Sequence, residues 1–139
     1  MDSCFPYASS NGSVPPCPLK CTGIGDWIKF KCAPGSIFNA VDNNEKMNQL
    51  YNYGPIENGF NVYTDFFNYK SGVYYHVSGM LVGVHVSKTL GWGIDSSTGL
   101  HYWLLANSWG TNWGMNGFFK FKMGDCNIDQ NGWGCSPLI

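Results

Sequence analysis

Hydrophobic residues alternate with polar ones, or gather in short runs, along most of the chain after residue 60. Gly, Asn, Asp and Ser separate these runs, which is typical of strands joined by tight turns. The stretches that we expect to form strands are 60–63, 80–90, 102–107 and 118–123. The sequence Asp95-Ser96-Ser97-Thr98-Gly99 predicts a hairpin turn between two of them. An antiparallel sheet closed into a barrel is therefore expected.

The strand expected over 80–90 carries the alternation that matters most, because successive side chains of a strand lie on opposite faces. We expect one face to point into the core, and it carries Met80, Val82, Val84 and Val86. The opposite face carries Leu81, Gly83, His85 and Ser87. His85 would then lie beside a glycine and a serine, with room for a ligand or a facing domain.

One helix is expected, beginning at Asp42-Asn43-Asn44-Glu45, which resembles a capping box. Met47, Leu50 and Tyr51 would share its apolar face, and Gly54-Pro55 would end it. Residues 1–41 carry Cys, Pro, Gly and Ser without sustained periodicity, so we expect an irregular segment held by disulfides. The predicted organisation is this stapled segment over 1–41, followed by one domain over 42–139.

The composition favours a single sheet-rich domain. The chain has 139 residues, of which 44% are hydrophobic and 12% charged, enough for one hydrophobic core. Its 17% of aromatic residues and 18 glycines favour a sheet with tight turns over a helical bundle. The net charge is -1 and there is no arginine, so neither nucleic acid nor an anionic membrane is expected as a partner. No apolar run approaches the length of a bilayer span, and the first residues do not resemble a signal peptide.

Six cysteines, four of them within the first 32 residues, indicate a disulfide framework formed in an oxidising compartment. A zinc site is the alternative, because only three residues separate Cys17 from Cys21. No matching second pair follows, and the surrounding Pro-Pro-Cys-Pro favours a stapled loop, so we expect no metal and no cofactor. The acceptor sequon Asn11-Gly12-Ser13 adds weak support for the secretory route.

The residues that point to chemistry are His85, Asn107 and Trp109. In a Cys-His-Asn arrangement the imidazole accepts the thiol proton, the asparagine orients the ring, and an indole can shield their hydrogen bond from water. Taken singly, each residue is more often structural: a histidine in a satisfied core site, an asparagine that caps a turn, a tryptophan that fills the core. His76 and His101 keep that structural interpretation.

Several longer motifs, in a fixed order, resemble one known family. They are Tyr53-Gly54-Pro55-Ile56-Glu57 and the runs 60–66, 69–79, 90–93, 102–110 and 113–119. Together they resemble the papain family, and within it cathepsin B, from Cys4 to about Ile128. The resemblance implies an α+β, papain-like fold, of which this chain holds mainly the antiparallel barrel domain. It also implies a cysteine peptidase that hydrolyses peptide bonds in proteins, located in the lysosome or vacuole or outside the cell.

The resemblance assigns roles to particular residues. His85 would act as general base and acid, Asn107 would orient its ring, and Trp109 would shield the pair. Trp113 would line the leaving-group side of the cleft. Gly83, which the strand alternation sets beside His85, would leave space there. Asn131 stands near the position of an acidic specificity-pocket residue, so a preference for basic side chains is doubtful.

The resemblance also implies which cysteines pair. Cys4 would join Cys32 and Cys17 would join Cys21, while Cys126 and Cys135 would pair with each other or stay free. None of the six has the spacing of a nucleophile, which in papain-like enzymes precedes the histidine by roughly 130 to 150 residues. We therefore expect the nucleophile upstream of Met1, on an amino-terminal papain-like domain that would be a partner of this chain, and we expect the chain alone to be inactive.

Besides Asn131, the sequence departs from the family pattern in two places. Val84 and Val86 flank His85, and Ser87 and Thr89 stand at positions that are normally aliphatic. The paired histidines of the cathepsin B occluding loop are missing from residues 8–16, so dipeptide trimming from the carboxyl end should be weak or absent. These changes leave an alternative open: a non-catalytic, papain-like binding module. A purely structural, disulfide-rich protein is a second alternative, which the presence of both His85 and Asn107 disfavours.

Overall fold

The computed structural model describes residues 13, 15–16, 19–21, 23–24 and 30–138. One compact unit, Cys32–Ser136, holds all the helices and strands of the described chain. The other unit comprises Met1–Lys31 and Pro137–Ile139, and its described residues include the largely exposed Leu19, Ile24 and Phe30. The domain boundary expected after residue 41 stays a prediction.

Helix α1, Asn43–Tyr53, forms where the capping box predicts it. The Asp42 carboxylate accepts the Glu45 N–H at 2.9 Å, and the Glu45 carboxylate accepts the Val41 N–H at 2.9 Å. Gly54 ends the helix with a φ of 98°, a value that favours glycine. The buried face differs from the expected one. Leu50 is buried as predicted, but Tyr51 is exposed and Lys46 is buried in its place.

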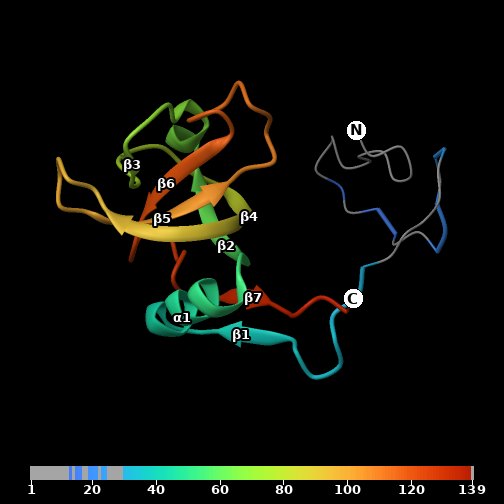
Figure 1. Ribbon diagram of the computed structural model, residues 1–139. Coiled ribbons are helices and arrows are strands. Elements are labelled where there is room, and N and C mark those ends of the chain that lie inside the picture. Colours follow the sequence, from blue (N-terminus) through green and yellow to red (C-terminus); the bar gives the residue numbers. More distant parts are fainter. Residues whose placement is uncertain (1–12, 14, 17–18, 22, 25–29, 139) are drawn as a thin grey trace. The chain divides into compact units, whose positions relative to one another are not determined.

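Seven strands form one sheet in the order β1-β7-β2-β4-β5-β6-β3. Their bounds are β1 Phe38–Ala40, β2 Ile56–Tyr63, β3 Val73–Tyr74, β4 Leu81–Ile94, β5 His101–Ala106, β6 Phe118–Lys122 and β7 Gly132–Gly134, with a 3-10 helix η1 at Thr64–Asn68. All neighbours are antiparallel except β3 and β6. Helix α1 lies beside β1 and β7 at one end, and η1 lies with β3 and β6 at the other (Figure 1). The α+β fold class is confirmed.

The four expected strands are all present, with changed bounds. Strand β2 begins four residues earlier than predicted, because pairing with β4 keeps Asn58 and Gly59 extended although both are turn-forming residues. Strand β4 continues to Ile94 through a register shift between Thr89 and Gly91, where a bulge bends the strand without ending it. The short strands β1, β3 and β7 have two or three residues each, too few for a detectable alternation.

The prediction of which face of β4 points into the core is wrong. Val82, Val84 and Val86 are 55%, 73% and 47% exposed, whereas Ser87 and Thr89 are buried. The reason is the register with β2, in which buried Phe60 pairs with His85 and therefore shares its face. Val-Gly-Val-His-Val offers apolar residues to one face only, but that face is turned away from the core of this unit. His85 lies on the inner face.

An aromatic cluster fills the core between the sheet and η1. Its fully buried members are Phe60, Phe66, Trp103, Phe119 and Phe121. Phe66, from η1, makes edge contacts with Phe60 at 5.4 Å and with Phe119 at 5.2 Å between ring centroids. Edge-to-face pairs of this kind stabilise beyond the area that they bury. The cluster packs against β2 at Phe60, the residue that contacts the ring of His85 on β4.

The disulfide prediction for Cys32 is wrong. Cys32 pairs with Cys135, not with Cys4, across a sequence separation of 103 residues. The two cysteines meet because β1 and β7 pair antiparallel just beside them, with Phe38 opposite Gly134. Cys126 is free among the described residues. Cys4 and Cys17 lie outside the described residues, so the pair Cys17–Cys21 stays a prediction.

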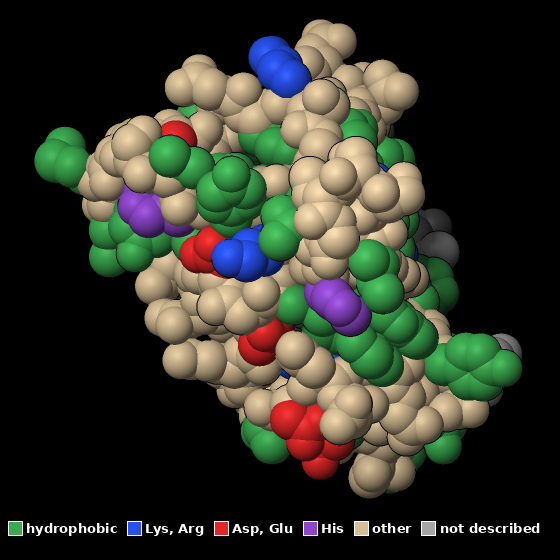
Figure 2. Space-filling model, turned by 90° about the vertical axis from the view of Figure 1, so that its left-hand side faces the viewer, with side chains coloured by type: hydrophobic (Ala, Val, Ile, Leu, Met, Phe, Trp, Pro, Cys, Tyr) green, Lys and Arg blue, Asp and Glu red, His purple; other side chains and the backbone are tan. Residues whose placement is uncertain are grey.

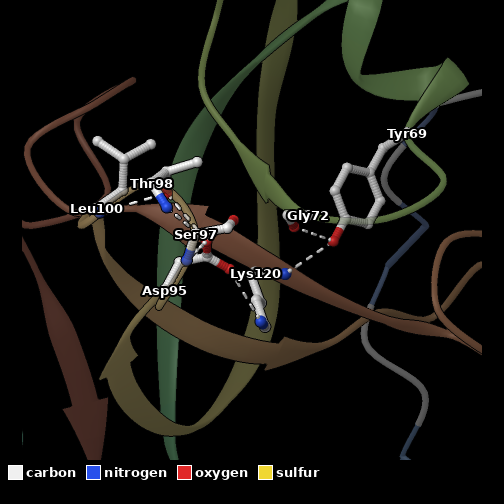
Figure 3. A network of polar contacts seen from close by, with 7 residues as sticks. All are labelled: Tyr69, Gly72, Asp95, Ser97, Thr98, Leu100 and Lys120. Carbon is white, nitrogen blue, oxygen red and sulfur yellow. Dashed lines mark hydrogen bonds and ion pairs between the residues drawn. The ribbon is translucent and has the colours of Figure 1, made fainter.

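The predicted hairpin turn after β4 forms as expected (Figure 3). One oxygen of Asp95 accepts hydrogen bonds from the backbone and hydroxyl of both Ser97 and Thr98, at 2.6–3.2 Å. These bonds, led by the one from the Ser97 hydroxyl, hold the pKa of Asp95 well below its usual range. The other oxygen of Asp95 faces the Lys120 ammonium at 3.4 Å, which ties the hairpin to β6.

Charged side chains are sparse on the surface drawn in Figure 2. Lysines occur there singly, one of them beside an acidic residue, and hydrophobic side chains surround two histidines. No helix within the described residues is long and apolar enough to cross a membrane. Among the same residues no cluster of His, Cys, Asp and Glu is arranged to hold a metal ion.

Candidate active site

His85 lies on β4, and the side chain of Phe60 on the neighbouring strand β2 packs against its ring. Its ring meets the edge of the Phe60 ring at a centroid distance of 5.7 Å and an interplanar angle of 83°. Phe60 is in turn locked by Phe66, Phe119 and Phe121, with ring centroids 4.8–5.7 Å away. The imidazole therefore packs against a buried cluster of aromatic rings, which restricts its rotation.

Asn107 follows β5 directly and reaches His85 across the sheet. The Nε2 atom of His85 lies 2.9 Å from the Asn107 Oδ1 atom. The same oxygen accepts the Ser108 N–H at 2.8 Å, which identifies it as the oxygen of the amide. Nε2 must then carry the hydrogen, because an amide oxygen only accepts. The Nδ1 atom of His85 is left as the basic nitrogen of the neutral ring.

The backbone of Asn107 is held independently of its side chain. Its N–H donates to the Gly117 carbonyl at 2.8 Å, and the Trp113 carbonyl accepts the Gly117 N–H at 2.8 Å. The turn 110–117 thus closes on the end of β5. This places the side chain of Asn107 at a fixed distance from β4.

Trp109 lies against the ring of His85. Its ring centroid is 5.0 Å from that of His85, with the two planes inclined at 31°. On its other side Trp109 stacks on Phe67 at 5.4 Å. Trp113 meets the edge of Trp109 at 5.1 Å and donates its indole N–H to the Phe67 carbonyl at 3.1 Å.

The other two predicted site residues lie in different surroundings. Gly83 is two residues before His85 on the same strand face, and a Cβ atom built on it would have no neighbour within 4 Å. The space beside His85 is therefore open. Asn131 stands just before β7, and its side-chain oxygen accepts from Asn39 at 3.4 Å. Within the described chain no contact joins Asn131 to His85 or Asn107.

Cys126 is the free cysteine of the described chain, and it is not suited to be a nucleophile. Burial, followed by a hydrogen bond to the Asp125 carboxylate, raises the pKa of its thiol to about 12. A nucleophilic cysteine needs the opposite shift, because the thiolate is the reactive form. Its thiol therefore stays protonated.

Sequence reasoning missed the rings that support the pair. Phe60 and Phe67 gave no signal by themselves, although the inner-face positions of β2, which include Ile56, Phe60 and Val62, alternate as a buried strand should. It also missed a hollow of about 530 Å³ next to Asn107, formed where β2 begins and β5 ends. Its lining residues are Pro55, Ile56, Glu57, Val86, Ser87, Lys88, Ala106, Asn107 and Ser108.

Residues 1–134 match the model of the papain family cysteine proteases. This chain belongs to that family. Within the family it is cathepsin B-like. It is 38% identical to cathepsin B-like cysteine proteinase 3 of Caenorhabditis elegans, over 92% of this chain and 38% of the relative. It is 47% identical to the cathepsin B-like cysteine proteinase of Schistosoma japonicum, over 66% of this chain and 27% of the relative.

Solved structures agree with this assignment. The papain-family chain matches the proCathepsin B S9 structure from Trypanosoma congolense with a TM-score of 0.76 and 36% identity, over 89% of this chain and 42% of the other. The bromelain protease of Ananas comosus has the same fold, with a TM-score of 0.67 at 23% identity. The chain thus spans less than half the length of these cathepsin B-like relatives.

Proposed function

We propose that this chain supplies the catalytic histidine and asparagine of a cathepsin B-like cysteine peptidase that hydrolyses peptide bonds in proteins. The observation that carries the proposal is the 2.9 Å contact between His85 Nε2 and Asn107 Oδ1, with Trp109 against the His85 ring. His85 from β4 meets there two residues of the loop that follows β5, in the arrangement that a Cys-His base requires.

Each group then has a defined task in the reaction. Nδ1 of His85 takes the proton of a cysteine thiol, and the resulting thiolate attacks the peptide carbonyl. Asn107 keeps Nε2–H engaged, so that only Nδ1 faces the nucleophile. The imidazolium next gives its proton to the leaving amine, and a water molecule, deprotonated by Nδ1, releases the acyl group from sulfur.

The nucleophile is proposed to come from an amino-terminal papain-like domain outside this chain. Cys126 is unsuitable, since its thiol is protonated, and the chain spans only 38% of its Caenorhabditis elegans relative. The chain alone should therefore be inactive.

One surface supports such a partner. Val82, Val84 and Val86 form an exposed apolar face of β4, and Val86 also lines the hollow beside Asn107. Exposed apolar patches on a protein surface often mark the site where another domain or protein binds. We propose that the amino-terminal domain contacts this valine face of β4.

A fusion experiment tests the proposal. The chain is joined to the nucleophile-bearing half of a cathepsin B-like relative, and cleavage of a fluorogenic dipeptide is measured under reducing conditions. The chain alone should show no turnover, and the fusion should show turnover that His85→Ala lowers by at least about 10²-fold. His101→Ala is the matched control, because His101 is an exposed histidine on β5, and it should leave the rate unchanged. Turnover by the chain alone that His85→Ala abolishes would overturn the proposal.

The altered residues around His85 support a second candidate, a papain-like binding module without catalysis. Ser87 and Thr89 stand at normally aliphatic positions and are both buried. The same fusion separates the two functions, since a module that binds the peptide but does not cleave it would support the second. For either function we propose the secretory route, ending in the lysosome or vacuole or outside the cell, which the disulfide Cys32–Cys135 fits.

A further inference from the structure

The indole of Trp109 is held by aromatic rings alone. Its ring centroid lies 5.0 Å from that of His85, 5.1 Å from Trp113, 5.4 Å from Phe67 and 5.5 Å from Phe66. No hydrogen bond joins the Trp109 indole N–H to any residue that the structure describes, whereas the Trp113 indole N–H donates to the Phe67 carbonyl. The position of Trp109 against His85 therefore depends on how firmly the neighbouring rings hold it.

Phe67 differs from the other rings around Trp109 because it has little other packing. Phe66 is fully buried in the core, and Trp113 contacts the buried Phe119 at 5.5 Å. The Phe67 side chain is 47% exposed, and within the described chain Trp109 is the only aromatic ring that it contacts. A half-exposed ring adds little to the hydrophobic core, so the ring of Phe67 packs mainly on the indole.

The 3-10 helix η1 explains how two adjacent phenylalanines reach the same indole. At about three residues per turn, neighbouring side chains project about 120° apart, so Phe66 enters the core while Phe67 stays at the surface. The backbone around Phe67 is anchored, because the Phe66 carbonyl accepts the Tyr69 N–H at 3.1 Å and the Phe67 carbonyl accepts the Trp113 indole N–H at 3.1 Å. An anchored backbone therefore carries the stacked ring.

The imidazole of His85 in turn packs between the rings of Phe60 and Trp109. It meets the edge of Phe60 at an interplanar angle of 83° and lies against Trp109 at 31°. Phe60 is buried in the core, so Trp109 is the contact that can be loosened. Among the described residues no ring contact joins Phe67 to His85, so Phe67 acts on the imidazole only through Trp109.

We infer that Phe67 is a positioning residue for Trp109: its stacked ring holds the indole against His85 and so limits rotation of the imidazole. The energy of an aromatic pair shifts an equilibrium between a held and a released ring about two- to tenfold. The inference rests on the proposed function only for its catalytic meaning, because the stack belongs to this chain whether or not the chain takes part in peptide hydrolysis.

Nuclear magnetic resonance on the full 139-residue chain tests it. In the unchanged chain, the carbon-bound ring protons of His85 should show nuclear Overhauser signals to the indole protons of Trp109. Phe67→Ala should weaken these signals at least about twofold, because the unsupported indole spends less time against His85. Phe67→Tyr keeps an aromatic ring at this position and should preserve the signals.

Tyr75→Ala is the matched control. The ring of Tyr75 is 45% exposed and lies 5.6 Å from the Lys122 ammonium, and within the described chain it has no ring contact with Trp109. Urea denaturation should show a similar small loss of stability for Tyr75→Ala and Phe67→Ala, while the His85–Trp109 signals weaken only in Phe67→Ala. Absence of these signals from the unchanged chain overturns the inference, as does equal weakening in both variants or no weakening in Phe67→Ala.

The fusion peptidase gives a second readout. There Phe67→Ala should lower kcat about two- to tenfold with KM unchanged, and Phe67→Tyr should keep the original kcat. A raised KM at unchanged kcat would overturn the positioning role, because it would put Phe67 in contact with the substrate. An inactive fusion would refute the proposed function and leave the resonance measurements to decide the inference.

Discussion

The inner face of the sheet carries aromatic rings at the end that holds His85, and polar side chains two to four residues further along the same two strands. At the aromatic end Phe60 is enclosed by three phenylalanine rings with centroids 4.8–5.7 Å away. At the polar end Asn58 pairs with Ser87 and Ile56 with Thr89, and all four side chains are buried. Both ends belong to β2 and β4, so secondary structure is not what distinguishes them.

The difference lies in how well each end satisfies its side chains. Every ring at the aromatic end has a partner of matching shape. At the polar end the Asn58 oxygen and the hydroxyls of Ser87 and Thr89 have no partner among the described residues. A polar group buried without a partner lowers the free energy of unfolding, whereas a well-packed ring raises it. The aromatic end thus stabilises the domain, and the polar end is retained at a cost.

Truncation of Phe60 should disrupt the packing of the aromatic end and change the free energy of unfolding more than any other substitution considered below. Phe60→Ala leaves a cavity under His85 in the centre of the cluster, and we expect it to lower the free energy of unfolding by about 3–5 kcal/mol. Urea denaturation followed by tryptophan fluorescence measures this. Tyr51→Ala, at a site that is 83% exposed on α1, is the control and should change it by less than about 0.5 kcal/mol. A similar small loss for Phe60→Ala would contradict the ranking of the two ends.

Lys46 adds a charge to the polar end. Its side chain is fully buried, and its ammonium donates to the Ile128 carbonyl at 2.8 Å, the same oxygen that the Asn58 amide reaches at 3.2 Å. The Asn58 and Lys46 side chains also pack closely against Gly132. A Cβ atom on Gly132 would lie 3.0 Å from the Asn58 oxygen and 3.2 Å from Lys46 Cε, so a larger residue at this position would displace them. Burial lowers the pKa of Lys46 to about 8, although Asp129 and Asp42 oppose the shift.

This lowered pKa gives the polar end a defined pH dependence. The unfolded chain, in which lysine has its usual pKa near 10.4, holds the proton more tightly than the folded chain does. The folded state is therefore penalised below pH 8, and the penalty is relieved as the pH rises from about 8 to 10.5.

Lys46→Met should remove the penalty, and we expect the free energy of unfolding to rise by about 2 kcal/mol at pH 6. The Ile128 carbonyl keeps its bond from Asn58, so the change leaves it with a partner. Urea denaturation at pH 6 and pH 9.5 measures the effect, and nearly all of the gain over the unchanged chain should be lost at the higher pH, because the penalty falls by about 1.4 kcal/mol per pH unit above pH 8. A gain equal at both pH values would show that packing, not ionisation, causes it.

Local signals in the sequence predicted the elements well. The Asp42–Glu45 capping box and the Asp95–Gly99 turn form as expected, because each depends on hydrogen bonds between residues at most four apart. The contact of His85 with Asn107 and Trp109 was also predicted, through motif resemblance. What the sequence could not supply was long-range pairing. Cys135 meets Cys32 only because β1 and β7 adjoin, and two- and three-residue strands leave no periodic pattern.

The wrong face of β4 has a related cause. Alternation shows that Val82, Val84 and Val86 share a face, but it does not show what that face contacts. Within this unit the register with Phe60 decides, and it turns His85, Ser87 and Thr89 inward. The valines were assigned to the core because they are apolar. In the proposed function they do become buried, but against a second domain.

The smallest predicted effect concerns Thr89, whose side chain is fully buried at the polar end. Valine has almost the same shape and lacks the hydroxyl, so Thr89→Val removes an unpaired polar atom without opening a cavity. We expect the free energy of unfolding to rise by about 1 kcal/mol, since desolvation of the hydroxyl is no longer required. Urea denaturation, with Thr98→Val in the exposed hairpin as control, checks this. Thr98 has hydroxyl contact with Asp95 at 3.0 Å, so its loss should destabilise and give the opposite sign. If Thr89→Val also destabilises, its hydroxyl has a partner, and the polar end is a satisfied network whose cost is confined to Lys46.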